Sequence, residues 1–364
     1  MRMAPKVIER LDFSNTPVRV VVGIIAIAVI GSGLVLLSGA SPWAAVVGIT
    51  EGAVGERYMV AETIVSTIPL ALIGLSLAPA LRAGVFSIGS EGQVAIGAMT
   101  ATAAITILPV NSAAMLLIGA ATGVFGGLVW AAIPAVLRAY CRVNEILSTL
   151  LLNYIADFLL LWVLKTLLAT RRIVPLPQSD PLPQAALIPK MLTGTRLHWG
   201  FLFVPIFALA LGWWLKSPRG VPYHIIATHA GLASRMGLTT TRAVMTTMLV
   251  SGGAAGLVGW LQVAGVAGTL YPTVAGGLGF TGVLVALLGR LGPLGILVAA
   301  LFFGILKTGA DGLQAGTGVP SSIATVIEGL VLFVAALSFA APARTPIKMG
   351  ARTSTDLVPA DTGL

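Results

Sequence analysis

The sequence predicts an all-α integral membrane protein with about ten transmembrane helices. Of its 364 residues, 57% are hydrophobic and only 10% are charged, and the mean hydropathy is +0.97. Soluble domains usually carry about 25% charged residues, so this composition excludes a soluble fold. The apolar residues also fall into runs of about 17 to 25 residues, which as helices are long enough to cross a hydrocarbon core about 30 Å thick.

The N-terminal residues 1–19 are basic and precede the first apolar run, at residues 20–37. A signal peptide has an apolar region of only ~7 to 15 residues, so the longer run is expected to be a first transmembrane helix. We therefore expect a cytoplasmic N-terminal segment at residues 1–19, a transmembrane domain at residues 20–340, and a cytoplasmic C-terminal tail at residues 341–364.

Further spans are expected at residues 63–81, 84–108, 113–137, 145–168, 198–215, 243–264, 271–289, 293–309 and 319–340. Between them, residues 38–62 and the proline-rich residues 169–197 are expected to form external loops, and residues 216–242 a long cytoplasmic connection. An even number of spans places both termini on the same side. Most of the 22 lysines and arginines then lie on the cytoplasmic side, as the positive-inside rule requires, although those within residues 165–196 do not.

Residues 83–97, AGVFSIGSEGQVAIG, predict a broken or re-entrant segment. Counted from Arg82, Glu91 would lie about 13 Å deep in the membrane. Glycines weaken a helix, and non-helical backbone at that depth is stable only when it packs against protein or lines a water-filled cavity. We therefore predict that Gly89, Glu91 and Gln93 line a solute pathway, with helix packing as the alternative.

The span at residues 145–168 carries polar residues at every fourth position: Glu145, Thr149, Asn153 and Asp157. This spacing predicts a shared helical face that points inward. Glu145 lies near the helix start, where it would complement the helix dipole. Asn153 and Asp157 lie deeper, and either interhelical hydrogen bonding or contact with a solute would explain them.

The last predicted span carries a similar polar stripe. Ser321, Thr325 and Glu328 are spaced so that they share one face, with Glu328 near the middle of the membrane. A charged residue at that depth is costly and requires a partner or a function. Helix packing and pathway lining are both open interpretations for Glu328.

Motifs for other kinds of chemistry are absent or have a simpler explanation. Residues 277–282, GLGFTG, match G-x-G-x-x-G, but no strand precedes them, so a dinucleotide site is not expected. The pairs Gly123/Gly127 and Gly252/Gly256 predict close helix packing. Three histidines and one cysteine provide no recognisable metal site or catalytic triad. We therefore expect no enzyme activity, no metal or cofactor bound by this chain, and no nucleic-acid partner.

The connection at residues 216–242 contains a short amphipathic pattern. Apolar residues recur at helical spacing at Tyr223, Ile226, Ala227 and Ala230, with polar residues between them. The pattern predicts a short helix that lies along the membrane surface. This helix is either a solvated segment that rests on lipid or a docking surface for a soluble partner.

Four segments occur in an order that resembles a known family. They are FSIGSEGQVAIGA, NEILSTLLLNYIA, SGGAAGLVGWLQV and GFTGVLVALLGRLGPLG. With the connection before the third segment, they make about residues 81–335 similar to the permease subunits of bacterial ATP-binding-cassette (ABC) importers of the simple-sugar and nucleoside branch. The motifs look more like the nucleoside type than like the ribose type.

The resemblance implies a multi-pass permease of the bacterial inner membrane, with both termini in the cytoplasm. Besides membrane lipid, it implies three partners: an ATPase subunit that carries ATP and Mg²⁺, an external substrate-binding lipoprotein, and a second permease chain. The nucleoside type pairs two different permease chains, whereas the ribose type is a homodimer. Contacts with the ATPase would map onto Tyr223, His229, Gly231, Ala233, Arg235 and Gly237. The sequence there reads ATHAGLASRMG, in which His229 and Ser234 depart from the family pattern.

We therefore expect a permease that imports a nucleoside or a simple sugar by alternating access. Two other hypotheses are open. One is a ribose-type permease that works as a homodimer. The other is an ion-coupled secondary transporter whose buried carboxylates relay protons. The sequence does not identify the solute, because the external receptor would be more selective than the permease wall.

Overall fold

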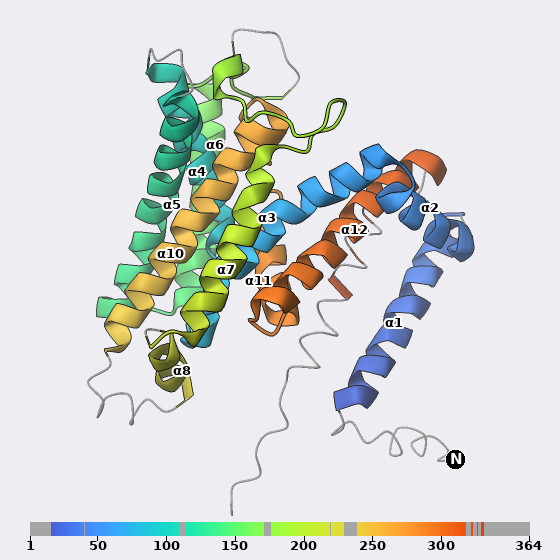
Figure 1. Ribbon diagram of the computed structural model, residues 1–364, viewed down its shortest axis with the longest axis horizontal. Helices are drawn as coiled ribbons and strands as arrows, with labels where there is room; N and C mark the ends of the chain where they lie inside the picture. The colour runs from blue at the N-terminus through green and yellow to red at the C-terminus, as the bar shows by residue number, and fades with distance from the viewer. Residues whose placement is uncertain are drawn as a thin grey trace, which may run out of the picture. The chain divides into compact units, whose positions relative to one another are not determined.

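The computed structural model describes residues 16–39, 41–108, 114–170, 176–218, 220–228 and 239–317, and four single positions at 322, 326, 329 and 330. Within these ranges the protein is helical, and its one β-type contact is an isolated bridge between Lys190 and His198 (Figure 1). The helices are α1 (Thr16–Leu37), α2 (Pro42–Val54), α3 (Arg57–Arg82), α4 (Ser90–Ile107), α5 (Ala114–Cys141), α6 (Glu145–Lys165), α7 (Phe203–Lys216), α8 (Val221–Thr228), α10 (Thr240–Leu261), α11 (Leu278–Leu288) and α12 (Pro293–Thr317). Shorter elements are the 3₁₀ turns η2 (Gln184–Ala186) and η3 (Trp199–Leu202) and the π-helical turn η4 (Gln262–Ala267).

The chain divides into two units. In the first unit, residues 1–30 and 329–364, the described part is the beginning of α1 and positions 329 and 330. The second unit, residues 31–328, contains the end of α1 and every other described helix. All contacts considered for function therefore lie within the second unit.

Most predicted spans are helices of the structure. The runs at residues 63–81, 113–137, 145–168, 198–215, 243–264 and 293–309 correspond to α3, α5, α6, η3 with α7, α10 with η4, and α12. In the described part of the chain, six helices are long and apolar enough to cross a membrane, or up to seven if the end of α1 and α2 form one bent span. The all-helical membrane fold is thereby confirmed. The run at residues 319–340 lies almost entirely outside the described residues, as do residues 1–15 and 341–364.

The prediction of a loop at residues 38–62 is wrong, because most of the first half of this stretch is helix α2. The Ser41 side chain accepts a hydrogen bond from the Ala44 backbone N–H at 3.0 Å, and proline occupies the first turn, so the helix start is well capped. α2 packs closely on α12, where Gly52 lies against Gly312.

The full span predicted at residues 271–289 is also wrong. Helix α11 has 11 residues, which is about 16 Å and half the thickness of a hydrocarbon core. Residues 268–277, which precede it, are not helical, and Gly277 adopts the left-handed conformation with φ of 83°. Pro272, Gly276 and Gly277 in this stretch disfavour a helix, so a prediction from the surrounding apolar run alone overlooks a signal that the sequence carries.

Helices α4, α5 and α10 lie side by side and form the most densely packed part of the bundle (Figure 1). Glycines allow this approach: a Cβ on Gly97 of α4 would overlap the backbone of Gly256, and a Cβ on Gly127 of α5 would overlap the carbonyl oxygen of Gly252. The close packing predicted from the two G-x-x-x-G pairs is therefore confirmed. Three helices are held at backbone contact distance, where none can shift without separating from the others.

The two long connections lie at opposite ends of α10 (Figure 1). Beyond its C-terminal end, the backbone of residues 176–198 is held by hydrogen bonds such as Leu182 N–H to Gly268 O at 2.8 Å and Ile188 N–H to Ala264 O at 2.9 Å. At its N-terminal end, Ile226 of α8 packs on Ala243. Since α10 and η4 together cover 28 residues, about 42 Å, these connections are separated by the full thickness of a membrane.

An ion pair between the buried Glu62 and the exposed Arg196 fixes the long connection at residues 176–198 to α3. The Arg196 Nε–H donates to both carboxylate oxygens of Glu62 at 2.9 Å, and Nη2 donates to the same carboxylate. Glu62 is buried, and the hydrogen bonds to its carboxylate raise the pKa of the Arg196 guanidinium. Breaking this pair would leave a buried charge without a partner.

Gly256→Ala is expected to destabilise the bundle. A Cβ at this position would overlap the carbonyl oxygen of Gly123, so α5 and α10 must separate, at a cost of about 1 to 3 kcal/mol. Gly212→Ala on α7 is the matched control, because the nearest atom to its Cβ is 3.7 Å away and alanine favours a helix. Thermal unfolding of the purified protein in detergent measures both. Equal melting temperatures would contradict the packing described here.

His198 is expected to make stability fall in mild acid. Its side chain is buried, its Nδ1 accepts the Gly200 N–H at 3.1 Å, and burial lowers its pKa from 6.5 to about 4. Because the folded-state pKa is the lower one, stability is complete above pH 6.5 and decreases as pH falls toward 4. The loss between pH 7.5 and 5 is about 2 kcal/mol.

The measurement is the melting temperature at a series of pH values for the wild type and for His198→Asn. Asparagine retains a side-chain acceptor for the Gly200 N–H but does not titrate. The difference between the two proteins should therefore be constant above about pH 6.5, where it reflects packing alone, and shift in favour of His198→Asn below it. Parallel curves across the range would show that His198 is not the cause.

Candidate functional site

The predicted break near residues 83–97 is present and lies at its N-terminal side. Helix α3 ends at Arg82, α4 begins at Ser90, and residues 83–89 between them are not helical. Gly84 has a left-handed φ of 75°, which an L side chain rarely adopts. We call residues 83–89 the α3–α4 break.

The start of α4 lies directly against the start of α11. A Cβ on Gly279 would overlap the backbone nitrogen of Glu91, so the two helix N-termini are in backbone contact. Each N-terminus exposes N–H groups that have no partner within its own helix and carries a partial positive charge. Two such ends side by side require an acceptor between them.

The Glu91 carboxylate is that acceptor. Its Oε1 accepts the Gly277 N–H and its Oε2 accepts the Gly279 N–H, both at 2.7 Å. Glu91 is buried and belongs to the first turn of α4, so one carboxylate balances both helix dipoles. Sequence reasoning predicted Glu91 as a pathway residue; in the structure both of its oxygens are engaged with backbone.

Asn153 of α6 supports the other side of the α4 start. Its Oδ1 accepts the Gly92 N–H at 3.0 Å, and its Nδ2 donates to the Ile88 carbonyl at 2.9 Å. Thr149, one turn earlier on α6, accepts the Ile88 N–H at 3.4 Å. Of the two interpretations open for Asn153, this geometry favours interhelical hydrogen bonding.

Asp157 does not share the buried face predicted for it. Glu145, Thr149 and Asn153 are buried, but Asp157 is exposed. A four-residue step turns about 400° around a helix, so three such steps displace the side chain by about 120°. Asp157 therefore lies on the outer surface of α6 in this subunit.

Glu145 forms an ion pair with Arg138 at 3.1 Å, between α6 and the end of α5. Asn144 caps α6 by accepting the Ile146 N–H at 2.9 Å. This agrees with the interpretation of Glu145 as a residue of the helix start. The arrangement orders the turn that joins the two helices.

Gln93 and Ser90 retain unused hydrogen-bonding capacity. Both side chains are buried, and in the described part of the chain neither Gln93 Oε1 nor Ser90 Oγ has a hydrogen-bond partner. Gln93 lies close to Gly89, whose Cβ, if present, would be 3.1 Å from Gln93 Nε2. Buried polar atoms without a partner are uncommon and indicate a place where water or a polar solute binds.

The amphipathic helix predicted at residues 223–230 is present as α8. The Tyr223 hydroxyl is hydrogen-bonded to Thr246 at 2.9 Å, and its ring meets the Trp214 ring edge-on, with 5.1 Å between centroids. α8 is therefore fixed to both α7 and α10. The other predicted coupling residues, His229, Gly231, Ala233, Arg235 and Gly237, lie outside the described residues, as does Glu328.

α8 also touches the α3–α4 break. A Cβ on Gly84 would be 3.3 Å from the Ala227 Cβ, and Tyr223 packs on the cluster that includes Ala83 and Val85. The short helix therefore contacts the segment that leads into the α4 start. Sequence reasoning missed this contact, and the glycine that follows Arg82 by two positions was its only signal.

Sequence reasoning also missed Gly277 and Gly279 as partners of Glu91. Their G-x-G-x-x-G pattern was set aside because no strand precedes it. The pattern nevertheless marks a helix N-terminus with accessible N–H groups, which is the physical property that lets it bind an acceptor. Here the acceptor is a side chain of the same protein.

The family of branched-chain amino acid transport system permease components matches residues 59–336. The chain is 30% identical to the guanosine ABC transporter permease protein NupP of Bacillus subtilis, over 92% of this chain and 96% of NupP. It is 30% identical to the glucose ABC transporter permease protein TsgB13 of Haloferax volcanii, over 76% of each chain. A second Bacillus subtilis protein, the guanosine ABC transporter permease protein NupQ, is 26% identical over 69% of this chain and 81% of NupQ. No solved structure gives a significant match.

Glu91→Gln is expected to destabilise the protein, whereas Asp157→Asn is not. A glutamine has one acceptor oxygen, so one of the two N–H groups at Gly277 and Gly279 loses its partner, at a cost of about 2 kcal/mol. Asp157 is exposed and serves as the matched change of carboxylate to carboxamide. The measurement is the melting temperature of each purified variant, compared with that of the wild type. An equal decrease in both would contradict a structural role for Glu91.

Proposed function

This chain belongs to the family of branched-chain amino acid transport system permease components, and we propose that it imports a nucleoside as the membrane-spanning subunit of an ABC importer. The similarity to the guanosine permease NupP covers nearly all of both chains, which supports a purine nucleoside as the first candidate solute. The similarity to a glucose permease makes a simple sugar the second candidate. The family is one of transport permeases, not of enzymes.

The proposed importer contains three other kinds of subunit. An ATPase binds ATP and Mg²⁺ on the cytoplasmic side, and a substrate-binding lipoprotein delivers the solute from outside. The second permease is proposed to be a different chain, because Bacillus subtilis has two guanosine permease proteins, NupP and NupQ, and this chain is similar to both. A homodimer is the alternative.

In this proposal, residues 216–242 face the cytoplasm and residues 169–197 face outward. The separation of these connections to opposite ends of α10 supports this assignment (Figure 1). Both termini are then cytoplasmic. The ATPase docks on residues 223–237, using Tyr223 together with His229, Gly231, Ala233, Arg235 and Gly237.

The observation that carries the mechanism is the contact between α8 and the α3–α4 break. Movement of α8, driven by the ATPase, reaches Gly84 and then the start of α4. Glu91 and Asn153 join that start to α11 and α6, so the three helices change position together. Such linked movement would open the pathway first to one side of the membrane and then to the other.

The solute pathway is proposed to run past the α4 start. Ser90 and Gln93 offer the unused polar groups, Gly89 lies beside Gln93, and Asp157 offers a carboxylate on the exposed face of α6. Glu91 and Asn153 give the pathway its shape. Glu328 stays a proposal from sequence alone. A site with few free polar groups binds weakly, which suits release of the solute to the other side.

An ion-coupled secondary transporter is less well supported. A proton relay requires a carboxyl group that is free to gain and lose a proton inside the membrane. Both oxygens of Glu91, the buried carboxylate nearest the proposed pathway, accept backbone hydrogen bonds instead.

Gly84→Val is expected to reduce guanosine uptake per ATP hydrolysed by about tenfold, because it disturbs the contact through which α8 acts on the break. Valine would strain the left-handed backbone and press on Ala227. Gly194→Val is the matched control: Gly194 has a similar φ of 79° but no atom within 4 Å of its Cβ. The measurement is ATP-driven guanosine uptake into vesicles that contain the complete importer.

Three results would each contradict a part of the proposal. If Gly84→Val and Gly194→Val transported equally, the α8 contact would not carry the coupling. If vesicles containing this chain alone accumulated guanosine against a gradient, the chain would be a secondary transporter. Uptake of glucose but not guanosine by the complete importer would replace the nucleoside with a sugar.

A further inference from the structure

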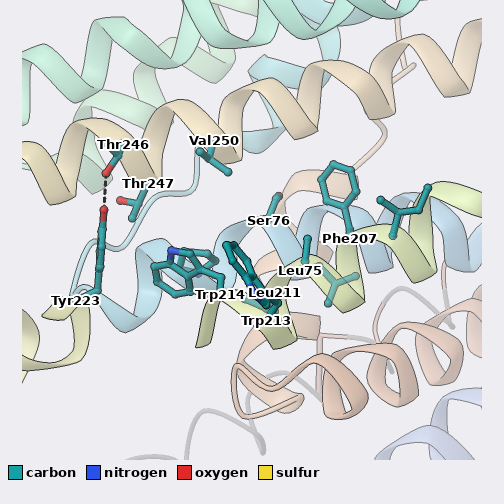
Figure 2. Close-up of a pocket in the computed structure, with 13 residues that line it drawn as sticks. Leu75, Ser76, Phe207, Leu211, Trp213, Trp214, Tyr223, Thr246, Thr247 and Val250 are labelled. Atoms are coloured by element: carbon teal, nitrogen blue, oxygen red, sulfur yellow. Dashed lines mark hydrogen bonds between the residues drawn. The ribbon is translucent and has the colours of Figure 1, made fainter. Parts of the chain in front are cut away.

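An apolar groove runs between α3, α7 and α10, and Tyr223 of α8 closes one end of it (Figure 2). Its volume is about 410 Å³, which lies within the range of small-ligand pockets. Its wall includes the apolar side chains of Leu75, Phe207, Leu211 and Trp214. The groove is separate from the α4 start, because no residue of α4 or α11 lines it.

The rim of the groove is apolar and exposed. Ile206 and Trp213 of α7 are 57% and 67% exposed, and Val250 of α10 is 59% exposed. All three belong to helices long and apolar enough to cross the membrane. The groove therefore opens toward hydrocarbon, not toward water.

The hydroxyl groups in the wall are already satisfied. Ser76 donates to the Ile73 carbonyl at 2.9 Å, and Thr247 donates to the Ala243 carbonyl at 2.7 Å. Thr246 is bonded to the Arg242 carbonyl and to the Tyr223 hydroxyl. Because these hydroxyl donors are already used, the groove suits an acyl chain, which needs no polar partner, better than a nucleoside or a sugar.

The end of the groove at α8 carries positive charge. Arg242 is exposed and lies one turn before Thr246 on α10, and Lys216 is exposed at the end of α7. The described residues of α7, α8 and α10 include no Asp or Glu. A basic site at the end of a groove between helices is suited to the phosphate of an anionic lipid.

We propose that this groove binds one acyl chain of an anionic phospholipid, with the lipid phosphate at Arg242 and Lys216. The chain lies along α7 from Trp214 toward Phe207, which are seven residues, or about 10 Å, apart. The bound lipid supports Tyr223 from the side opposite the protein core. This site goes beyond the proposed transport function, which does not require it.

The test is native mass spectrometry of the full-length purified chain with dioleoylphosphatidylglycerol or dioleoylphosphatidylcholine added. Ala210→Phe fills the groove, since Ala210 is part of its wall. It should lower phosphatidylglycerol binding by more than about tenfold, because several methylene groups lose their contacts. Leu209→Phe is the matched control, because Leu209 is 74% exposed on the same helix and does not line the groove.

Arg242→Gln tests the contact with the lipid headgroup separately from the contact with the acyl chain. It should lower binding of phosphatidylglycerol by about fivefold and that of phosphatidylcholine by less, because the choline cation offsets the charge of the phosphate. Equal binding by Ala210→Phe and Leu209→Phe would overturn the groove as the site. Equal affinity of the wild type for both lipids would overturn the anionic lipid. So would crosslinking of a Trp213→Cys variant to a partner protein in the assembled complex, because the groove would then be covered by protein.

Discussion

The rest of the site depends on two hydrogen bonds, which the Glu91 carboxylate accepts from the N–H groups of Gly277 and Gly279. Two helices begin inside an apolar bundle, and neither start can be hydrated as it would be at a water-exposed surface. The N–H groups of each start must therefore find acceptors within the protein. Glu91 of α4 accepts hydrogen bonds from the start of α11, and Asn153 of α6 accepts one from the start of α4. The α3–α4 break and the short helix α11 therefore depend on each other, because Glu91, at the helix start that the break creates, satisfies the N–H groups at the start of α11.

This arrangement leaves few polar groups for a solute. Glu91 and Asn153, which the sequence suggests as contacts for a solute, instead form hydrogen bonds with backbone groups. Among the described residues near the α4 start, Ser90 and Gln93 have unused polar groups, and Asp157 lies on the exposed surface of α6. In the proposed importer, such a pathway would offer weak contacts, and selectivity would belong to the receptor that delivers the solute.

The break was predictable because glycines cluster around a carboxylate in an otherwise apolar run. Its partner was not, because Gly277 lies 186 residues from Glu91 and only the fold brings them together. The shortness of α11 had a signal that hydropathy alone overlooks, since Pro272, Gly276 and Gly277 directly precede the helix and disfavour helical backbone. Asp157 was misplaced because a four-residue spacing drifts around a helix, and the drift accumulates over three turns.

The position of α8 explains why movement at the surface would reach the site and not be absorbed on the way. α4, α5 and α10 are in backbone contact through Gly97, Gly127 and Gly256, so they resist sliding past one another. The α3–α4 break is not part of a helix and makes no such backbone contacts, and its Gly84 has a left-handed backbone conformation. α8 touches the bundle at this softer segment as well as at α10. A force on α8 is therefore taken up first by the break, and the break leads directly into the helix start that Glu91 and Asn153 hold.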